Sequence, residues 1–294
     1  MPAVLFERVA IIGIGLIGSS LALALRKHGL ARRVVCADSN PVHVAKALEL
    51  SLVDEAGTDL AAAVKGADLV VLCTPVGALA ALAAEIASQC TPGMIVSDVG
   101  SVKELVVERV APLLPKGVHL VPAHPIAGTE HSGPAAGFAE VFVGRWCILT
   151  PPDGTDPAAV DKMTALWRQI GSMVEIMDAA HHDRVLAITS HLPHLIAYSI
   201  VDTAVGLEDS TQSEVIKFSA SGFRDFTRIA ASDPVMWRDI FLNNREAVLD
   251  ILQRFNEDLT ALQRAIRYGE GATLQEVFTR TRAIRRGIID AKQA

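Results

Sequence analysis

The first 178 residues alternate between short apolar runs and amphipathic segments. The apolar runs, rich in Val, Ile and Leu, cover residues 9–13, 33–38, 68–75, 94–100, 118–124, 146–151 and 173–178. Between them lie segments with helical patterns at residues 16–29, 41–51, 76–90, 101–114 and 156–171. Apolar strands that alternate with amphipathic helices are typical of a parallel sheet covered on both faces. The pattern predicts an α/β domain over residues 1–178 with a doubly wound, mostly parallel sheet.

The strand pattern stops after Asp178, and residues 179–294 have a helical pattern with one break around residues 219–234. Residues 233–269 are expected to form one long helix, with Asp233 as its N-cap and Pro234 as its first residue. We therefore expect an all-α C-terminal domain over residues 179–294.

The long helix carries an apolar stripe at spacings of three and four residues, which runs from Phe241 to Ile266. A helix of some 35 residues would be roughly 50 Å long, and one small domain cannot cover such a stripe. We expect a homodimer that pairs through the C-terminal helices. The alternative is a bundle within one chain, formed with the final helix at residues 273–291.

Composition limits the classes of function. The 294 residues are 50% hydrophobic and carry a net charge of −6 without a basic run, which argues against a nucleic-acid partner. The four cysteines are far apart and have no metal-ligand spacing, so we interpret them as buried thiols in a reducing cytoplasm. We expect no metal site.

Two uncharged stretches, residues 9–25 and 69–84, are short for a membrane span, and each is interrupted by glycine. The N-terminal residues 1–8 lack the basic region of a signal peptide. We expect a cytoplasmic protein without a membrane partner.

The strongest motif is Gly13-x-Gly15-x-x-Gly18, between an apolar strand and a helix. These glycines permit a tight turn, a close approach of the backbone to a pyrophosphate, and close packing of helix on strand, while Leu16 and Ile17 begin the helix whose free amides face the phosphates. The motif predicts a Rossmann-type dinucleotide site; the alternative is a tight turn without a nucleotide.

An acid, Asp38, ends the next strand, where it is expected to accept hydrogen bonds from the adenine ribose. An acid there disfavours a 2′-phosphate, so NAD is expected rather than NADP. Thr74, Pro75 and Val76 end another strand, and ligands of doubly wound sheets lie at the carboxyl ends of strands. These three residues are candidates to line the cofactor site, unless they only end the strand.

His124 follows a predicted strand and is the best candidate for acid–base chemistry, because a neutral imidazole can take a proton from an alcohol as hydride leaves the same carbon. Ser101 is a second polar candidate at the same edge, although it is also placed to be the N-cap of the helix that follows, with Glu104 completing a capping box.

The helical half offers further candidates. His191 and His194 lie three residues apart on a helix that Pro193 should disturb, and they are interpreted as a polar pocket lining or as core histidines. Arg224 and Arg228 fall in the break between helices, where a guanidinium can bind a carboxylate through two hydrogen bonds.

Five motifs occur in an order that resembles the prephenate/arogenate (cyclohexadienyl) dehydrogenase family of tyrosine biosynthesis. The resemblance runs from about residue 9 to about residue 262, over "GIGLIGSSLA", "SDVGSVK", "HPIAGTEHSG", "SHLPH" and "GFRDFTRIAASDPVMWRDI". The glycine loop is shared by many families, whereas the third and fifth motifs are specific. The resemblance implies an NAD(P)-dependent oxidative decarboxylation of prephenate to 4-hydroxyphenylpyruvate, or of arogenate to tyrosine.

The resemblance also implies roles for individual residues. His124 would polarise the C4 hydroxyl of the substrate ring, and Ser101 would hydrogen-bond near that hydroxyl and the nicotinamide. His194 would lie beside the substrate side chain and Arg228 would bind a substrate carboxylate. Thr129 and Glu130 would form a pair at the mouth of the pocket.

Two alternative functions stay open. A β-hydroxyacid dehydrogenase or an imine reductase would share the two-domain plan but lack the "HPIAGTE" element. A regulator that binds NAD without turnover would need no histidine facing the nicotinamide.

Overall fold

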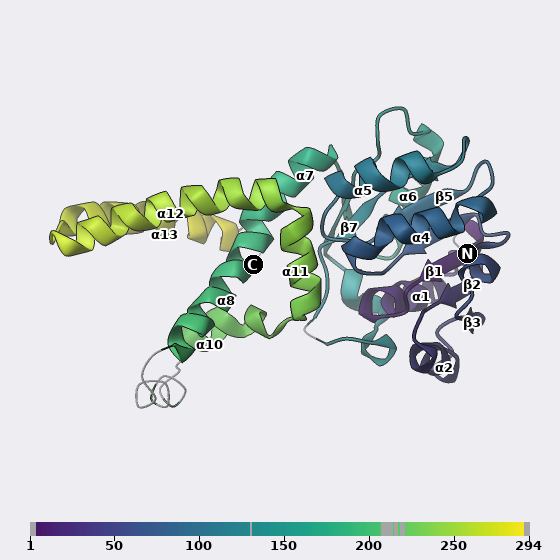
Figure 1. Ribbon diagram of the computed structural model, residues 1–294, viewed down its shortest axis with the longest axis horizontal. Helices are drawn as coiled ribbons and strands as arrows, with labels where there is room; N and C mark the ends of the chain where they lie inside the picture. The colour runs from purple at the N-terminus through teal and green to yellow at the C-terminus, as the bar shows by residue number, and fades with distance from the viewer. Residues whose placement is uncertain (1–3, 130, 207–213, 215–216, 218–220, 291–294) are drawn as a thin grey trace. The chain divides into compact units, whose positions relative to one another are not determined.

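The computed structural model describes residues 4–129, 131–206, 214, 217 and 221–290 (Figure 1). By its internal contacts the chain forms two compact units, Met1–Arg245 and Glu246–Ala294. The first unit contains both β-sheets and the helices through α11, and the second is a helical hairpin. The boundary that the sequence predicts between the α/β domain and the helical domain, at residues 178 and 179, lies inside the first unit.

The larger sheet is parallel, with the strand order β3-β2-β1-β4-β5-β6. Its strands are β1 (Phe6–Ile12), β2 (Ala31–Ala37), β3 (Glu55–Gly57), β4 (Leu69–Leu72), β5 (Ile95–Asp98) and β6 (His119–Leu120). The chain winds outward from β1 in both directions, so the doubly wound, Rossmann-type fold expected from the sequence is confirmed.

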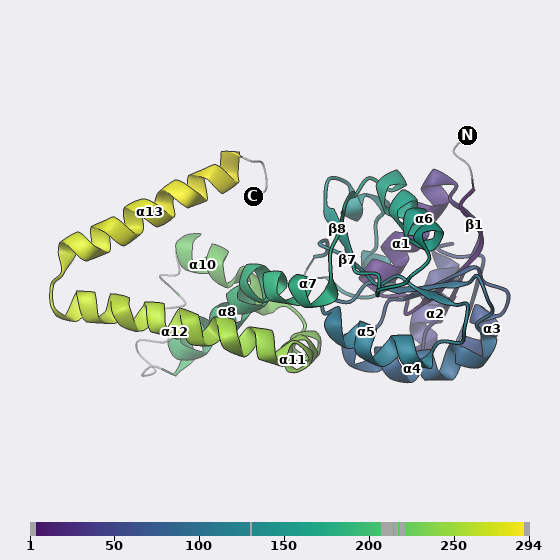
Figure 2. The same ribbon diagram turned by 90° about the horizontal axis from the view of Figure 1, so that it is seen from above.

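Both faces of this sheet are buried. Alternate strand residues point to opposite sides, and an apolar cluster covers each side. In β1, Val9 and Ile11 belong to one apolar cluster, whereas Ala10 and Ile12 belong to another. Figure 2 shows α1 and α6 on one side of the sheet and α4 and α5 on the other. The helices of these layers are α1 (Leu16–His28), α2 (Pro41–Glu49), α3 (Leu60–Val64), α4 (Leu79–Ile86), α5 (Glu104–Val110) and α6 (Pro157–Gln169).

A second, three-stranded sheet in the order β7-β8-β9 was not expected. It consists of β7 (Ala123–Pro125), β8 (Trp146–Leu149) and β9 (Met173–Ile176), with β7 antiparallel to β8. The prediction of one strand over residues 118–124 is therefore wrong: β6 and β7 belong to different sheets, with Val121 and Pro122 between them. Pro122 has no amide to donate to a ladder, which favours a change of partner at this point. His124 lies within β7 instead of after a strand.

The connections between these elements contain short 3₁₀ turns. They are η1 (Val76–Ala78), η2 (Ala87–Gln89), η3 (Ala111–Leu113), η4 (Pro134–Ala136) and η5 (Ala139–Phe142). The loop that carries η4 and η5 packs closely on α1: a Cβ atom at Gly137 would lie 2.1 Å from Ser19 Oγ. This contact places the segment after the "HPIAG" motif beside the helix that follows the glycine loop.

The helical part of the first unit begins with α7 (Ala179–Leu186), the π-helical turn η6 (Ala187–His191) and α8 (Leu192–Val205). The disturbance expected at Pro193 is confirmed, because the π-helical turn ends two residues before it and α8 restarts with Pro193 in its first turn. By length and composition alone, the stretch Ala179–Val205 is apolar enough to cross a membrane, which is weak evidence on its own. It contains His182 and Asp183, which are buried and hydrogen-bonded to residues of the first unit.

The chain continues through α10 (Ser221–Thr227), η7 (Arg228–Ala231), α11 (Pro234–Asn243) and α12 (Arg245–Arg267). The predicted start at Asp233 is confirmed, because its carboxylate accepts a hydrogen bond from Met236 N at 2.8 Å. The prediction of one continuous helix is wrong: Asn244 leaves the helical conformation, with φ −111° and ψ 37°. Its side chain is buried and hydrogen-bonded to residues far away in the sequence, which outweighs one more turn of helix.

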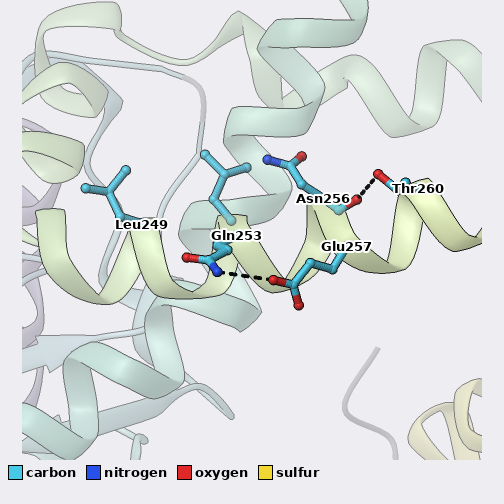
Figure 3. Close-up of a pocket in the computed structure, with 6 residues that line it drawn as sticks. Leu249, Gln253, Asn256, Glu257 and Thr260 are labelled. Carbon is cyan, nitrogen blue, oxygen red and sulfur yellow. Dashed lines mark hydrogen bonds between the residues drawn. The ribbon is translucent and has the colours of Figure 1, made fainter.

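The second unit is a hairpin of α12 and α13 (Gly271–Asp290), joined at a turn where Gly269 has φ +66°. Figure 2 shows the two arms diverging from this turn. Large apolar side chains stay exposed along both arms: Leu249, Leu259, Ile266, Tyr268, Phe278 and Ile284. Figure 3 shows one shallow pocket on α12, where Gln253 donates to Glu257 beside Leu249. Of the apolar stripe on α12, Leu259 and Ile266 are thus exposed, whereas the other members are buried or half-buried.

Candidate functional site

The glycine loop has the geometry that a dinucleotide requires. Gly13 has φ +93°, and a Cβ atom there would lie 2.6 Å from Cys73 O. A Cβ at Gly18 would lie 2.1 Å from Gly13 O, so helix and strand pack too closely for any side chain. At Gly15 nothing lies within 4 Å of such a Cβ, which leaves the outer side of the loop open.

Helix α1 starts at Leu16 and Ile17 without a side-chain cap, because its N-cap residue is Gly15. The first amides of a helix need an acceptor, and a pyrophosphate supplies one at the positive end of the helix dipole. The tight turn, the open side and the uncapped helix together fit a dinucleotide.

Asp38 lies directly after β2, and its carboxylate reaches the glycine loop. It accepts hydrogen bonds from Ile14 N at 2.9 Å and from Asn40 N at 2.8 Å. His43 Nδ1 lies 3.5 Å from the same carboxylate. The acid is therefore beside the loop at the carboxyl edge of the sheet, where the sequence predicts that the adenine ribose binds.

The segment after β4 adjoins both the glycine loop and the segment after β5. Thr74 Cγ2 would lie 2.9 Å from a Cβ at Gly13, and Val76 Cγ2 would lie 2.9 Å from a Cβ at Gly100. The Thr74 hydroxyl is buried and has no partner within the described part of the chain, whereas Pro75 leads into η1 and Val76 is buried. Three successive strand ends thus converge at one edge.

Ser101 does not cap helix α5, so that alternative is wrong. The helix starts at Glu104, and the Asp183 carboxylate accepts hydrogen bonds from Lys103 N at 2.8 Å and from Glu104 N at 3.0 Å. An acid from α7 thus satisfies the amides that Ser101 was expected to satisfy. Ser101 is half-buried beside this helix, and its hydroxyl makes no hydrogen bond among the described residues.

His124 is the first member of a chain of three buried polar side chains. Its Nδ1 lies 2.8 Å from His182 Nε2, and His182 Nδ1 lies 2.7 Å from Asp183 Oδ1. A carboxylate only accepts, so His182 carries its proton on Nδ1 and accepts through Nε2. His124 must then donate from Nδ1, which leaves its Nε2 unprotonated. That atom has no hydrogen-bond partner in the described part of the chain.

The electrostatic environment keeps this imidazole neutral. Burial is the main cause that holds the pKa of His124 well below its ordinary value, and the neighbouring His182 and Lys103 lower it further. Burial also lowers the pKa of His182, although Asp183 opposes that shift. A neutral imidazole with a free Nε2 is the form that accepts a proton.

A buried ion pair supports the strand that carries His124. The Lys103 ammonium group donates to the Asp98 carboxylate and, at 2.9 Å, to the carbonyl oxygen of Ala123. Neither side chain is exposed to solvent, so both charges depend on this pairing. Because Ala123 precedes His124 in β7, the pair ties the end of β5 to the candidate base.

His194 and Arg228 lie near one another on the helical side. The His194 ring stacks on Trp237 with centroids 3.6 Å apart, and its Nδ1 donates to Ser190 O at 2.9 Å. Burial lowers the pKa of His194, and the charge of Arg228 contributes to that shift. Arg228 starts η7 and is exposed, as is Arg224 on α10. The positive charge of Arg228 thus acts on the ring of His194, whose Nε2 has no hydrogen-bond partner among the described residues.

Thr129 lies on the exposed turn after β7, where its hydroxyl accepts a hydrogen bond from His131 N at 3.2 Å. It lines a hollow together with Ile126, Phe138 and Arg145. Glu130 lies outside the described residues. Among the described residues, no three His, Cys, Asp or Glu side chains converge as metal ligands. All four cysteines are free, and burial raises the pKa of Cys36 to about 12.

Local sequence patterns assign no role to Lys103, His182, Asp183 or Asn244. A signal for His182 exists: it lies four residues before the buried Leu186 on α7, so it falls on the apolar face of that helix. A histidine beside an aspartate on such a face must be paired inside the protein. Asn244 shows no such signal, because its place within an apolar repeat predicts helix.

Comparison with known proteins agrees with this geometry. Residues 21–176 match the model of the prephenate dehydrogenase nucleotide-binding domain, and residues 178–280 match that of the prephenate dehydrogenase dimerization domain. A cyclohexadienyl dehydrogenase of Zymomonas mobilis is 42% identical over 280 residues, or 95% of either chain. A prephenate dehydrogenase of Bacillus subtilis is 34% identical over 92% of this chain and 72% of its own length.

Solved structures show the same likeness. A crystal structure of prephenate dehydrogenase from Aquifex aeolicus, in complex with hydroxyphenyl propionate and NAD+, has a TM-score of 0.90 and 35% identity over 96% of this chain and 98% of its own. Arogenate dehydrogenase from Synechocystis has a TM-score of 0.81 and 28% identity, and it covers 95% of this chain and 99% of its own. Both domains, the sequence identity and the fold lead to one conclusion: this chain belongs to the prephenate dehydrogenase family.

Proposed function

We propose that the protein catalyses the NAD-dependent oxidative decarboxylation of prephenate to 4-hydroxyphenylpyruvate, of arogenate to tyrosine, or of both. The observation that carries this proposal is the His124–His182–Asp183 chain, which supports an imidazole with a free basic nitrogen. A regulator that binds a nucleotide without turnover has no need of such a base.

His124 acts as the general base. Bound NAD supplies the acceptor for a hydride from C4 of the substrate ring. As hydride leaves, Nε2 of His124 takes the proton of the C4 hydroxyl, and a carbonyl forms at C4. The bond to the ring carboxylate then breaks and carbon dioxide leaves. The electron pair of that bond makes the ring aromatic, and the C4 oxygen takes the proton back from His124 to give the phenol. The charge that develops on His124 is shared with His182 and stabilised by Asp183.

Other residues orient the substrate. Ser101, which is free of hydrogen bonds among the described residues, donates to or accepts from the C4 hydroxyl near the nicotinamide. Arg228 binds a substrate carboxylate and His194 contacts the side chain next to it, a pairing supported by the effect of Arg228 on the pKa of His194. Thr129 borders the mouth of the pocket.

The cofactor is bound by the glycine loop and the ends of β2 and β4. The residues are Gly13, Gly15, Leu16, Ile17, Gly18, Asp38, Thr74, Pro75 and Val76. The Asp38 carboxylate favours the ribose hydroxyls of NAD and repels the 2′-phosphate of NADP. Its hydrogen bond to Ile14 N supports a position beside the loop.

The assembly we propose is a cytoplasmic homodimer. Residues 1–178 bind the cofactor, and residues 179–294 complete the substrate site and pair with a second copy of the chain. The match to a dimerization domain and the exposed apolar side chains of the diverging hairpin support this arrangement.

The test measures formation of reduced nicotinamide with prephenate, arogenate and a 3-hydroxyacid, each supplied with NAD and with NADP. We expect turnover of prephenate or arogenate, with a higher kcat/KM for NAD than for NADP. Turnover of the 3-hydroxyacid alone would support the β-hydroxyacid alternative, and binding of NAD without any turnover would support the regulator.

A further inference from the structure

Asn244 interrupts the long helix for a reason outside that helix. It is 5% exposed, and its side chain points away from the solvent. The amide nitrogen lies 2.9 Å from the carbonyl oxygen of Asp183 and 3.1 Å from Nδ1 of His191. The helix therefore breaks where Asn244 buries its side chain against Asp183 and His191. The break makes these two hydrogen bonds possible and contributes nothing to the helix itself.

The orientation of this amide follows from its partners. A carbonyl oxygen only accepts, so the atom next to Asp183 O is the NH₂ group of Asn244. The second proton of that group then reaches Nδ1 of His191, which must be an acceptor. Burial lowers the pKa of His191 to about 4, so its ring is neutral and carries its proton on Nε2. The side-chain amide of Asn244 therefore holds the carbonyl group of Asp183 in place and also sets the tautomer of His191.

Asp183 connects Asn244 to the candidate base His124. Its carboxylate holds His182 and the first amides of α5, and its carbonyl oxygen is held by Asn244. The residue is 1% exposed, so water does not compete for either group. Movement of Asp183 would lengthen the hydrogen bond to His182, and through it the bond to His124.

We propose that Asn244 is a positioning residue for the general base, which acts through Asp183 and His182 and fixes the tautomer of His191. Asn244 lies between α11, which ends at Asn243, and α12, which starts at Arg245. This inference rests on the proposed function for its kinetic consequence.

The experiment compares Asn244→Ala and the isosteric Asn244→Asp, which keeps the shape of the side chain but not its NH₂ group. The control is Asn243→Ala. Asn243 is the preceding residue, and its amide also donates to a backbone carbonyl, that of Asp239 at 2.7 Å, but it touches no member of the chain from His124 to Asp183. Each variant is assayed for kcat and KM, for thermal unfolding, and for the imidazole N–H signal of His182 by proton NMR of histidine-labelled protein. His182→Asn identifies that signal.

We expect both Asn244 variants to lower kcat about tenfold, the effect of losing roughly one hydrogen bond, with KM values for substrate and NAD within about twofold of the wild type. The His182 signal should shift or broaden in both variants and stay in place in Asn243→Ala. An unchanged kcat, or a lowered kcat with an unchanged His182 signal, would overturn the proposal. So would failure of both variants to fold, because Asn244 would then be a residue of general stability. The NMR readout needs no turnover, so a wild-type protein that is inactive on prephenate and arogenate would reject the proposed function without deciding the hydrogen-bond arrangement.

Discussion

His124 and His182 face one another with Nδ1 of the first 2.8 Å from Nε2 of the second, and they lie 58 residues apart in the sequence. Because Asp183 accepts from the far nitrogen of His182, only one arrangement of protons satisfies all three side chains. That arrangement leaves Nε2 of His124 ready to accept a proton.

Replacing His124 with asparagine should remove the base and leave the binding groups in place. We expect kcat to fall by about 10² to 10⁴, the usual contribution of a general base, with little change in KM. Steady-state kinetics with NAD measure both constants. Near-normal turnover by this variant would show that His124 is not the base.

Asp183→Asn tests the tautomer. An amide has only one oxygen for the three groups that now donate to the carboxylate, His182 Nδ1, Lys103 N and Glu104 N. Where its NH₂ group faces His182, His182 donates to His124 and leaves the proton of His124 on Nε2. We expect kcat to fall by about 10² or more, as in other enzymes where the base is held in the wrong tautomer. Proton NMR should show loss of the His182 Nδ1–H signal. If kcat stays within about twofold of the wild type, the tautomer is not set by Asp183.

The buried histidines should make the protein sensitive to acid. The pKa of His191 is about 4 in the folded protein against about 6.5 when unfolded, so between these values the unfolded chain binds more protons. Stability is full above pH ~6.5 and falls as the pH drops toward 4, by about 3 kcal/mol from this residue. Chemical denaturation over this range measures the loss. His191→Gln should flatten the profile, whereas a change at an exposed histidine of α7, His181→Gln, should not.

The activity should also be lost at acid pH, because His124, like His191, has a lowered pKa. Burial holds its pKa well below the ordinary value near 6.5, so the base stays unprotonated at neutral pH and kcat/KM is lost only when the pH falls through that lowered value. A pH profile of kcat/KM measures the acid limb. A limb at or above pH 6.5 would contradict a buried, neutral His124.

Arg228→Gln should mainly weaken substrate binding. The side chain is exposed at the start of η7, and its positive charge contributes to lowering the pKa of His194. Loss of a charged partner for a carboxylate should raise the KM for the substrate by about tenfold or more, with a smaller effect on kcat and none on the KM for NAD. An unchanged substrate KM would remove Arg228 from the site.

The hairpin should hold the dimer together. Leu259 and Ile266 lie on the apolar stripe of α12 and are exposed. Leu259→Glu/Ile266→Glu should convert the dimer to a monomer in sedimentation velocity, because burying two charges against an apolar face is unfavourable. Arg264→Glu places the same charge on the opposite side of α12 by helical periodicity and should leave the dimer intact. A wild-type protein that sediments as a monomer would reject the proposed assembly.

Local patterns were sufficient for much of this fold. The alternation of apolar runs and amphipathic segments predicted the parallel sheet, and the glycine spacing predicted a loop whose geometry the structure confirms. The N-cap at Asp233 and the disturbed helix at Pro193 were also readable. Each of these features depends on neighbours within a few residues, which the sequence displays directly.

The tertiary structure decided the rest. Whether residues 118–124 form one strand or two depends on which sheet each half joins, and the helix break at Asn244 depends on partners 61 and 53 residues away. The sequence determined by itself the strands and helices that have a clear apolar period, and which residue types are able to do chemistry. It could not determine that His124, His182, Asp183 and Asn244 form one hydrogen-bonded chain, because contacts between distant residues are selected by packing of the whole unit and leave no trace in the local period of apolar positions.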